Sequence, residues 1–134
     1  MTSNHTSIVY RPLVYDGQLK TYIGSPNAYH TSVEAIIEAM NFADLYNDDM
    51  YDGAIVWQDS EVTRASNNNL RVLSGSLKDD GAPTFFIEIK QLLNKGSIQV
   101  SEKSRAKPVA RERNQAMAMR VGEEIDLMDY PINE

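Results

Sequence analysis

The densest group of residues with binding chemistry is a basic segment near the C-terminus. Five positive side chains lie within eleven residues: Lys103, Arg105, Lys107, Arg111 and Arg113. Pro108 can open a helix in this segment, because its missing N–H would be unpaired at the first helical position anyway. Cations there oppose the helix dipole, and a bound anion would remove that conflict while accepting from free backbone N–H groups. The segment therefore predicts a site for a phosphate-bearing ligand.

Two further residues could hold the rest of such a ligand. Asn114 shares a helical face with Met117 and Val121, so its amide would need partners, which a nucleobase edge or a second subunit could supply. Phe86 could contact a base, although aromatic residues of this kind more often form the core. The predicted ligand-binding set is Arg105, Lys107, Arg111, Arg113, Asn114 and Phe86.

The basic segment also has two plainer interpretations. Its side chains could form ordinary solvated surface or pair with the acids that follow, namely Glu123, Glu124, Asp126 and Asp129. They could instead meet an acidic protein partner. These alternatives stand beside the phosphate site.

Residues for nucleophilic catalysis are sparse. The chain has no cysteine, and His5 and His30 are its only histidines. His30 lies just before a predicted helix N-terminus, where the dipole disfavours imidazolium. No Gly-x-Ser-x-Gly elbow, phosphate loop or dinucleotide-binding glycine motif occurs. We therefore expect no catalytic residue, and a binding protein is favoured over an enzyme.

An acidic cluster around Gly53 suggests a metal loop, but it fails the spacing test. With Gly53 at position six of an EF-hand loop, Asp48 takes position one, Met50 position three and Asp59 position twelve. Methionine offers no oxygen, and the bidentate glutamate is missing. We expect no metal site and no cofactor; a looser Mg²⁺ or Ca²⁺ site is the alternative.

Charge is distributed in blocks that restrict the partners. Residues 1–60 and 123–134 are strongly acidic, whereas 103–122 carry six bases and one acid, within a net charge of −6. Most of the surface would repel a phosphate lattice, so duplex DNA is disfavoured as a partner. No signal peptide and no apolar run of membrane-spanning length is visible. We expect a cytoplasmic protein without a membrane partner.

The N-terminal half predicts a hairpin followed by a helix. Residues 8–23 read as two strands around a two-residue Asp16-Gly17 turn, with Val14 opposite Leu19. Pro12 places its strand at an edge or a bulge. Thr31 and Glu34 fit a capping box for a helix that ends near residues 45–47.

The second half predicts short strands at 54–57, 61–64, 70–73 and 97–100, and two helices. Apolar spacing assigns one helix to 84–95, with Gly96 after its end, and the last from Pro108 through Gly122 to about 128. Fold class is α+β: a small, mainly antiparallel sheet with two to three helices and an amphipathic C-terminal helix. Residues 1–6 are expected to be a disordered tail, and 7–134 one domain with a basic linker and helix at 101–128.

Three functions follow as hypotheses. The first is a non-enzymatic protein, oligomeric through the C-terminal helix, that holds a nucleotide or another anionic small molecule. The second is an accessory or inhibitor protein that uses the acidic residues 34–59 against a basic partner. The third is a metal-dependent hydrolase.

Overall fold

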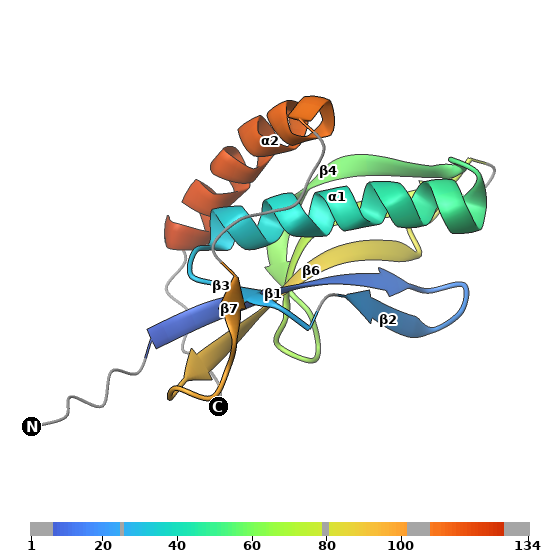
Figure 1. Ribbon diagram of the computed structural model, residues 1–134. Helices are drawn as coiled ribbons and strands as arrows, with labels where there is room; N and C mark the ends of the chain where they lie inside the picture. The colour runs from blue at the N-terminus through green and yellow to red at the C-terminus, as the bar shows by residue number, and fades with distance from the viewer. Residues whose placement is uncertain (1–6, 25, 79–80, 102–107, 128–134) are drawn as a thin grey trace, which may run out of the picture.

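The fold is that of a computed structural model, which describes residues 7–24, 26–78, 81–101 and 108–127. Within these ranges, side chains are described except at 59, 101, 108–113, 126 and 127. The described chain forms one sheet with two helices on the same side (Figure 1). It is an α+β fold with a mainly antiparallel sheet, as predicted, and it has two helices.

Seven strands build the sheet in the order β4-β5-β6-β1-β3-β7, and β2 pairs with β1 beside this path. Their bounds are β1 Ser7–Asp16, β2 Thr21–Gly24, β3 Ala28–Tyr29, β4 Ile55–Arg64, β5 Leu70–Leu77, β6 Phe85–Asn94 and β7 Val100–Ser101. The two helices are α1, Ser32–Tyr51, and α2, Pro108–Leu127. All pairings are antiparallel except that of β3 with β7.

The predicted N-terminal hairpin forms, but its turn is longer than the sequence indicated. Asp16 pairs with Thr21 and Val14 with Ile23, so four residues connect the strands and Val14 does not face Leu19. Gly17 is needed for close approach: its N–H donates to the Thr84 carbonyl at 2.8 Å, and a Cβ would lie 2.2 Å from that oxygen. The left-handed residue of this turn is Lys20, with φ 55°.

Strand β1 lies inside the sheet, so the expectation of an edge strand at Pro12 is wrong. Its whole length pairs with β6 on one side, and Pro12 faces Ile89. On its other side β3 pairs at Tyr10 and β2 pairs from Leu13 onward. Pro12 thus stands between two short partners, where a missing N–H removes no ladder hydrogen bond.

Asp16 ties the end of β1 to the end of α1. Its fully buried carboxylate accepts from the backbone N–H groups of Gln18 and Leu19 at 2.8 and 3.0 Å. The hydroxyls of Tyr46 and Tyr51 donate to its other oxygen, from Tyr51 at 2.7 Å. Burial opposes ionisation, but these hydrogen bonds outweigh it and hold the pKa of Asp16 below 3.8.

Helix α1 begins where its cap predicts and runs further than expected. The Thr31 side chain accepts from the Glu34 N–H at 3.2 Å, which confirms the predicted N-cap. The helix continues to Tyr51, past the expected end, and Asp52 closes it in the left-handed conformation. Tyr51 explains the extra turn, because it reaches Asp16 from there. The predicted polar turn is therefore confined to the residues around Gly53.

The predicted helix at 84–95 is wrong, because this segment is strand β6. Its residues satisfy two periodicities: Phe85, Ile89 and Leu92 fit a helix, while Phe85, Ile87 and Ile89 alternate as in a strand. The alternating set is buried under α1. Strands β5 and β1 flank the segment, so tertiary pairing decides between the two patterns. Gly96, expected after a helix end, follows the strand in a positive-φ turn.

The predicted strands in the middle of the chain merge. Segments 54–57 and 61–64 are one strand, β4, with an irregularity between Asp59 and Thr63. It is an edge strand, in which Ile55 is buried and Val56 is 42 % exposed. Strand β5 extends the predicted 70–73. The strand predicted at 97–100 is wrong over 97–99, because only Val100 of that segment lies in a strand, the short β7.

Helix α2 begins at Pro108 and continues through Gly122, as predicted. It packs antiparallel on α1, and Val121 and Ile125 are buried (Figure 1). The apolar face of α2, which includes Val121 and Ile125, is therefore covered by α1 of the same chain. Residues 1–6, 128 and most of the basic linker lie outside the described residues. No helix of the described chain has the length and apolarity to cross a membrane.

The two helices approach most closely at Gly122. A Cβ at this position would lie 2.7 Å from the Val33 Cγ2 atom. Gly122→Leu should therefore force α2 away from α1 and lower the free energy of unfolding by about 1–3 kcal/mol. Urea denaturation checks this. Ala116→Leu, at an exposed position of α2, should change stability little; equal losses from both variants would contradict the close packing at Gly122.

Candidate functional site

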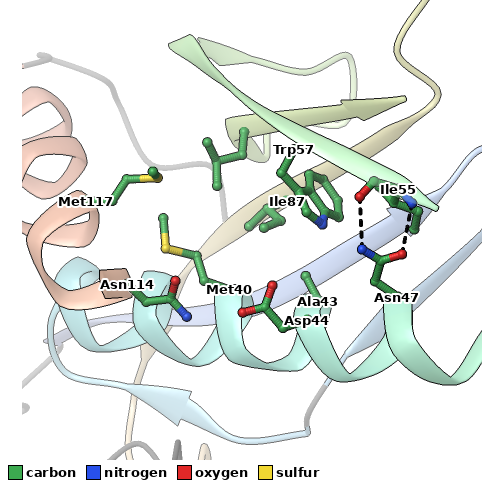
Figure 2. Close-up of a pocket in the computed structure, with 10 residues that line it drawn as sticks. Met40, Ala43, Asp44, Asn47, Ile55, Trp57, Ile87, Asn114 and Met117 are labelled. Carbon is green, nitrogen blue, oxygen red and sulfur yellow. Dashed lines mark hydrogen bonds between the residues drawn. The ribbon is translucent and has the colours of Figure 1, made fainter. Parts of the chain in front are cut away.

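A cavity of about 380 Å³ lies between α1, β4 and α2. Figure 2 shows its lining side chains converging from these three elements and from β6. The lining is Met40, Ala43, Asp44, Asn47, Ile55, Trp57, Leu73, Ile87, Asn114 and Met117. Its lining mixes apolar side chains with the polar Asp44, Asn47 and Asn114, and its volume lies within the range of small-molecule sites.

Trp57 supplies one wall of the cavity as a flat ring. Its position depends on Gly75, its register partner on β5, because a Cβ there would lie 2.8 Å from the Trp57 Cε3 atom. Glycine thus lets the indole lie against the sheet. The Trp57 Nε1 atom is buried and has no hydrogen-bond partner among the described residues. A buried donor without a partner is costly, and a ligand acceptor would relieve that cost.

Two asparagines fix the ends of the cavity. The Asn47 amide donates to the Ile55 carbonyl and accepts from the Ile55 N–H, both at 2.9 Å, which joins β4 to α1. The buried Asn114 amide donates to Asn41 Oδ1 at 2.6 Å, which joins α2 to α1. The side chain predicted to need a polar partner therefore has one in this chain, and it also lines the cavity.

The predicted basic residues lie beside this cavity or outside the described chain. Arg105 and Lys107 belong to the segment that the structure does not describe. Arg111 and Arg113 are on the first turns of α2, although their side chains lie outside the described residues. They precede the cavity-lining Asn114 and Met117 by three and four positions, which is one helical turn.

Phe86 is separated from the other predicted ligand-binding residues. Its neighbours Phe85 and Ile87 are buried on the helix side of β6, so alternation directs Phe86 to the opposite face. There the Arg71 guanidinium carbon lies 3.6 Å from the centroid of the Phe86 ring. Arg71 also forms an ion pair with Glu88 at 3.2 Å, and the Glu88 side chain is fully buried.

The carboxylate of Glu88 is the common hydrogen-bond acceptor for the polar side chains around Arg71. It accepts from the Tyr22 hydroxyl at 2.9 Å, the Asn69 amide at 3.0 Å and both Nε and Nη2 of Arg71. Tyr22 in turn packs on Tyr15, with ring centroids 4.8 Å apart. Burial of the Tyr22 hydroxyl, its hydrogen bond to Glu88 and the charge of Glu88 raise its pKa above 10.0.

The acidic cluster gives no metal centre within the described chain, where no three His, Cys, Asp or Glu side chains gather suitably. Asp48, Asp49 and Asp52 are exposed, and His30 is exposed too.

Sequence reasoning missed Trp57, Asp44 and Asn47 as cavity residues, and Arg71 and Glu88 altogether. The one signal for Trp57 was that this lone tryptophan lies opposite Gly75 in the neighbouring strand. That signal can be recognised only when the strand register is known. The chain matches no protein-family model, no curated protein and no solved structure.

Proposed function

We propose that the chain is a non-enzymatic binding protein for a small phosphate-bearing ligand such as a nucleotide. The observation that carries this proposal is the buried Trp57 Nε1 donor without a partner in the wall of the cavity. An acceptor on the edge of a planar ligand ring, lying in the plane of the indole, would accept from this donor. The Asn114 side chain lies on the opposite side of the cavity (Figure 2).

The phosphate belongs outside the cavity rather than within it. Asp44 lines the hollow, and a carboxylate there would repel a phosphate while accepting from ring N–H groups. The first turns of α2 offer the opposite environment, with free backbone N–H groups and the positive end of the helix dipole. In the proposed complex Arg111 and Arg113 neutralise the phosphate, with Arg105 and Lys107 before them in the chain.

Fluorescence titration tests this proposal, because Trp57 is the only tryptophan in the chain. AMP, ADP, ATP and their guanine and pyrimidine counterparts are added singly to the purified protein. At least one of them should change the Trp57 emission with saturation and raise the melting temperature. No response to any nucleotide would refute the proposal.

Two variants separate the parts of the proposed site. Arg111→Ala with Arg113→Ala should weaken nucleotide binding on the order of 100-fold, since two charge-assisted contacts are lost. The parent nucleoside should bind equally to this variant and the unchanged protein. Arg120→Ala, later on the same helix, is the matched control. Unchanged nucleotide affinity in the double variant would place the phosphate elsewhere.

A second function, binding of a basic protein by the acidic half, has one observation in its favour. Leu45 and Met50 on α1 are 56 % and 53 % exposed, beside the exposed acids Asp48 and Asp49. Apolar contacts rimmed by acids suit a basic partner. Charge reversal at Asp48, Asp49 and Asp52 should then slow association; a pull-down indifferent to that reversal would reject this function.

The predicted self-association also stays a proposal. Native mass spectrometry of protein purified from its host would report the subunit number and any retained small molecule together.

A further inference from the structure

The sheet face that points away from α1 and α2, called the open face here, carries aromatic and basic side chains, although Val9 and Glu88 on this face are fully buried. Successive side chains of a strand point to opposite faces, so the register of β1, β2, β5 and β6 shows which polar and aromatic side chains lie on this face. They include Arg11, Tyr15, Tyr22, Arg71, Phe86, Glu88 and Lys90. This face is distinct from the cavity, which lies on the helix side of the same strands.

Arg71 forms a flat platform whose orientation is fixed in advance. Its guanidinium lies on the Phe86 ring and is held by two contacts to Glu88, at 3.2 and 3.3 Å. One guanidinium face meets the ring, and the side chain is 33 % exposed. Guanidinium planes stack on nucleobases, and a plane fixed by a buried carboxylate loses little entropy in doing so.

Tyrosines extend this platform across the neighbouring strands. Tyr15 stacks beside Phe86, with centroids 6.5 Å apart and planes within 20°. Tyr22 packs on Tyr15 and is 41 % exposed, while Glu88 and Asn67 both hydrogen-bond its hydroxyl. Its ring therefore has a fixed orientation and an accessible surface, which suits stacking of a second base.

A pair of like charges on the open face points to a polyanion. Arg11 and Lys90 are direct register partners on β1 and β6 and project to the same side. Like charges directly opposite each other destabilise a sheet. Neither residue forms an ion pair with another described residue, and the buried Arg11 Nε has no partner among them. A phosphate between the two side chains would remove the repulsion and supply the missing acceptor.

The spacing of these features requires more than a nucleoside monophosphate. Phe86 and Lys90 are four residues apart on β6, which corresponds to about 13 Å along a strand. This separation exceeds the reach from a base to its own phosphate, so stacked base and bound phosphate belong to different nucleotides. On this face of the four strands there are three positively charged side chains, Arg11, Arg71 and Lys90, and one carboxylate. That carboxylate, Glu88, is buried and paired with Arg71.

We propose that the open face binds single-stranded nucleic acid, with bases stacked on Arg71 and Tyr22 and a backbone phosphate between Arg11 and Lys90. A duplex hides its bases from such a platform, so it should bind far more weakly. The site is independent of the proposed nucleotide cavity.

Fluorescence anisotropy with labelled oligo(dT) and oligo(rU), and with duplexes of equal length, tests the proposal on the full chain. We expect single strands to bind, with affinity falling as salt rises. Lys90→Glu should weaken binding by more than tenfold and make the salt dependence shallower by about one contact. Tyr22→Leu should weaken binding about tenfold, since base stacking is lost.

The controls separate this site from general attraction and from misfolding. Lys78→Glu makes the same charge change at an exposed residue beyond the end of β5, seven residues from Arg71, and should leave affinity nearly unchanged. Lys90→Glu should keep or raise the melting temperature, because it replaces a like-charge pair with an opposite-charge pair. Equal losses from Lys78→Glu and Lys90→Glu, equal affinity for duplexes, equal binding of a polyglutamate chain, or no single-strand binding would each overturn the proposal.

Discussion

Replacement of Glu88 by alanine should lower the free energy of unfolding by about 4 kcal/mol, because it removes one partner of a buried ion pair. The carboxylate is fully buried and accepts from Tyr22, Asn69 and Arg71. Without it, these donors lose their acceptor in the middle of the sheet, and the Arg71 charge loses its partner. Urea denaturation monitored by circular dichroism measures the effect.

A double-mutant cycle shows whether the loss of stability comes from breaking the Arg71–Glu88 ion pair or from leaving the Arg71 charge without a partner. Glu88→Leu with Arg71→Leu removes both charges and should be less destabilising than Glu88→Leu alone, because no unpaired guanidinium remains. Additive losses in the double variant would mean that Arg71 and Glu88 contribute independently. That result would also weaken the description of Arg71 as held in place by the buried carboxylate.

Asp16→Asn should lower the free energy of unfolding on the order of 3 kcal/mol at neutral pH, and the melting temperature by roughly 10 °C. An amide keeps the shape of the side chain but cannot accept from both tyrosine hydroxyls and both backbone N–H groups. Asp48→Asn, the same change at an exposed position on α1, should have almost no effect. Similar losses from both variants would contradict the role assigned to Asp16.

The pH dependence of this difference follows from the pKa shifts. Because folding lowers the pKa of Asp16, its contribution is fully present above about pH 3.8 and is lost as pH falls through the lower folded value. Burial of Tyr51, followed by its hydrogen bond to Asp16, raises the pKa of Tyr51 to about 12. The contribution of Tyr51 is therefore present below pH 10 and lost between 10 and 12. Denaturation of the unchanged and variant proteins across this range should give curves that converge at acid pH.

Local signals in the sequence were sufficient to predict where the two helices begin. Thr31 and Pro108 mark the starts of α1 and α2, since capping and the missing proline N–H act within a single turn. The fold class followed from the order of elements. The prediction for segment 84–95 was wrong because Phe85 to Leu93 fit both the helix and the strand periodicity. Pairing with β5 and β1, which are separate segments of the sequence, makes it a strand.

The candidate site was only partly predictable for the same reason. The basic segment and Asn114 are visible because they are neighbours in the chain. The cavity depends on Asn47, Trp57 and Asn114 meeting across α1, β4 and α2, which no local pattern encodes. Phe86 was chosen for its ring alone; its partner Arg71 and the carboxylate of Glu88 required the sheet register.

The central place of β1 has a consequence for how the chain is made. Strand β1 leaves the ribosome well before its full-length partner, β6, and can pair fully only after residue 94 has been synthesised. Until then only β2 and β3 are available to it, and the edge that will meet β6 stays open. Contacts so distant in sequence slow folding. Nascent chains stopped before Phe85 should therefore be sensitive to proteases and prone to aggregate, whereas chains that extend beyond β6 should become protected in one step.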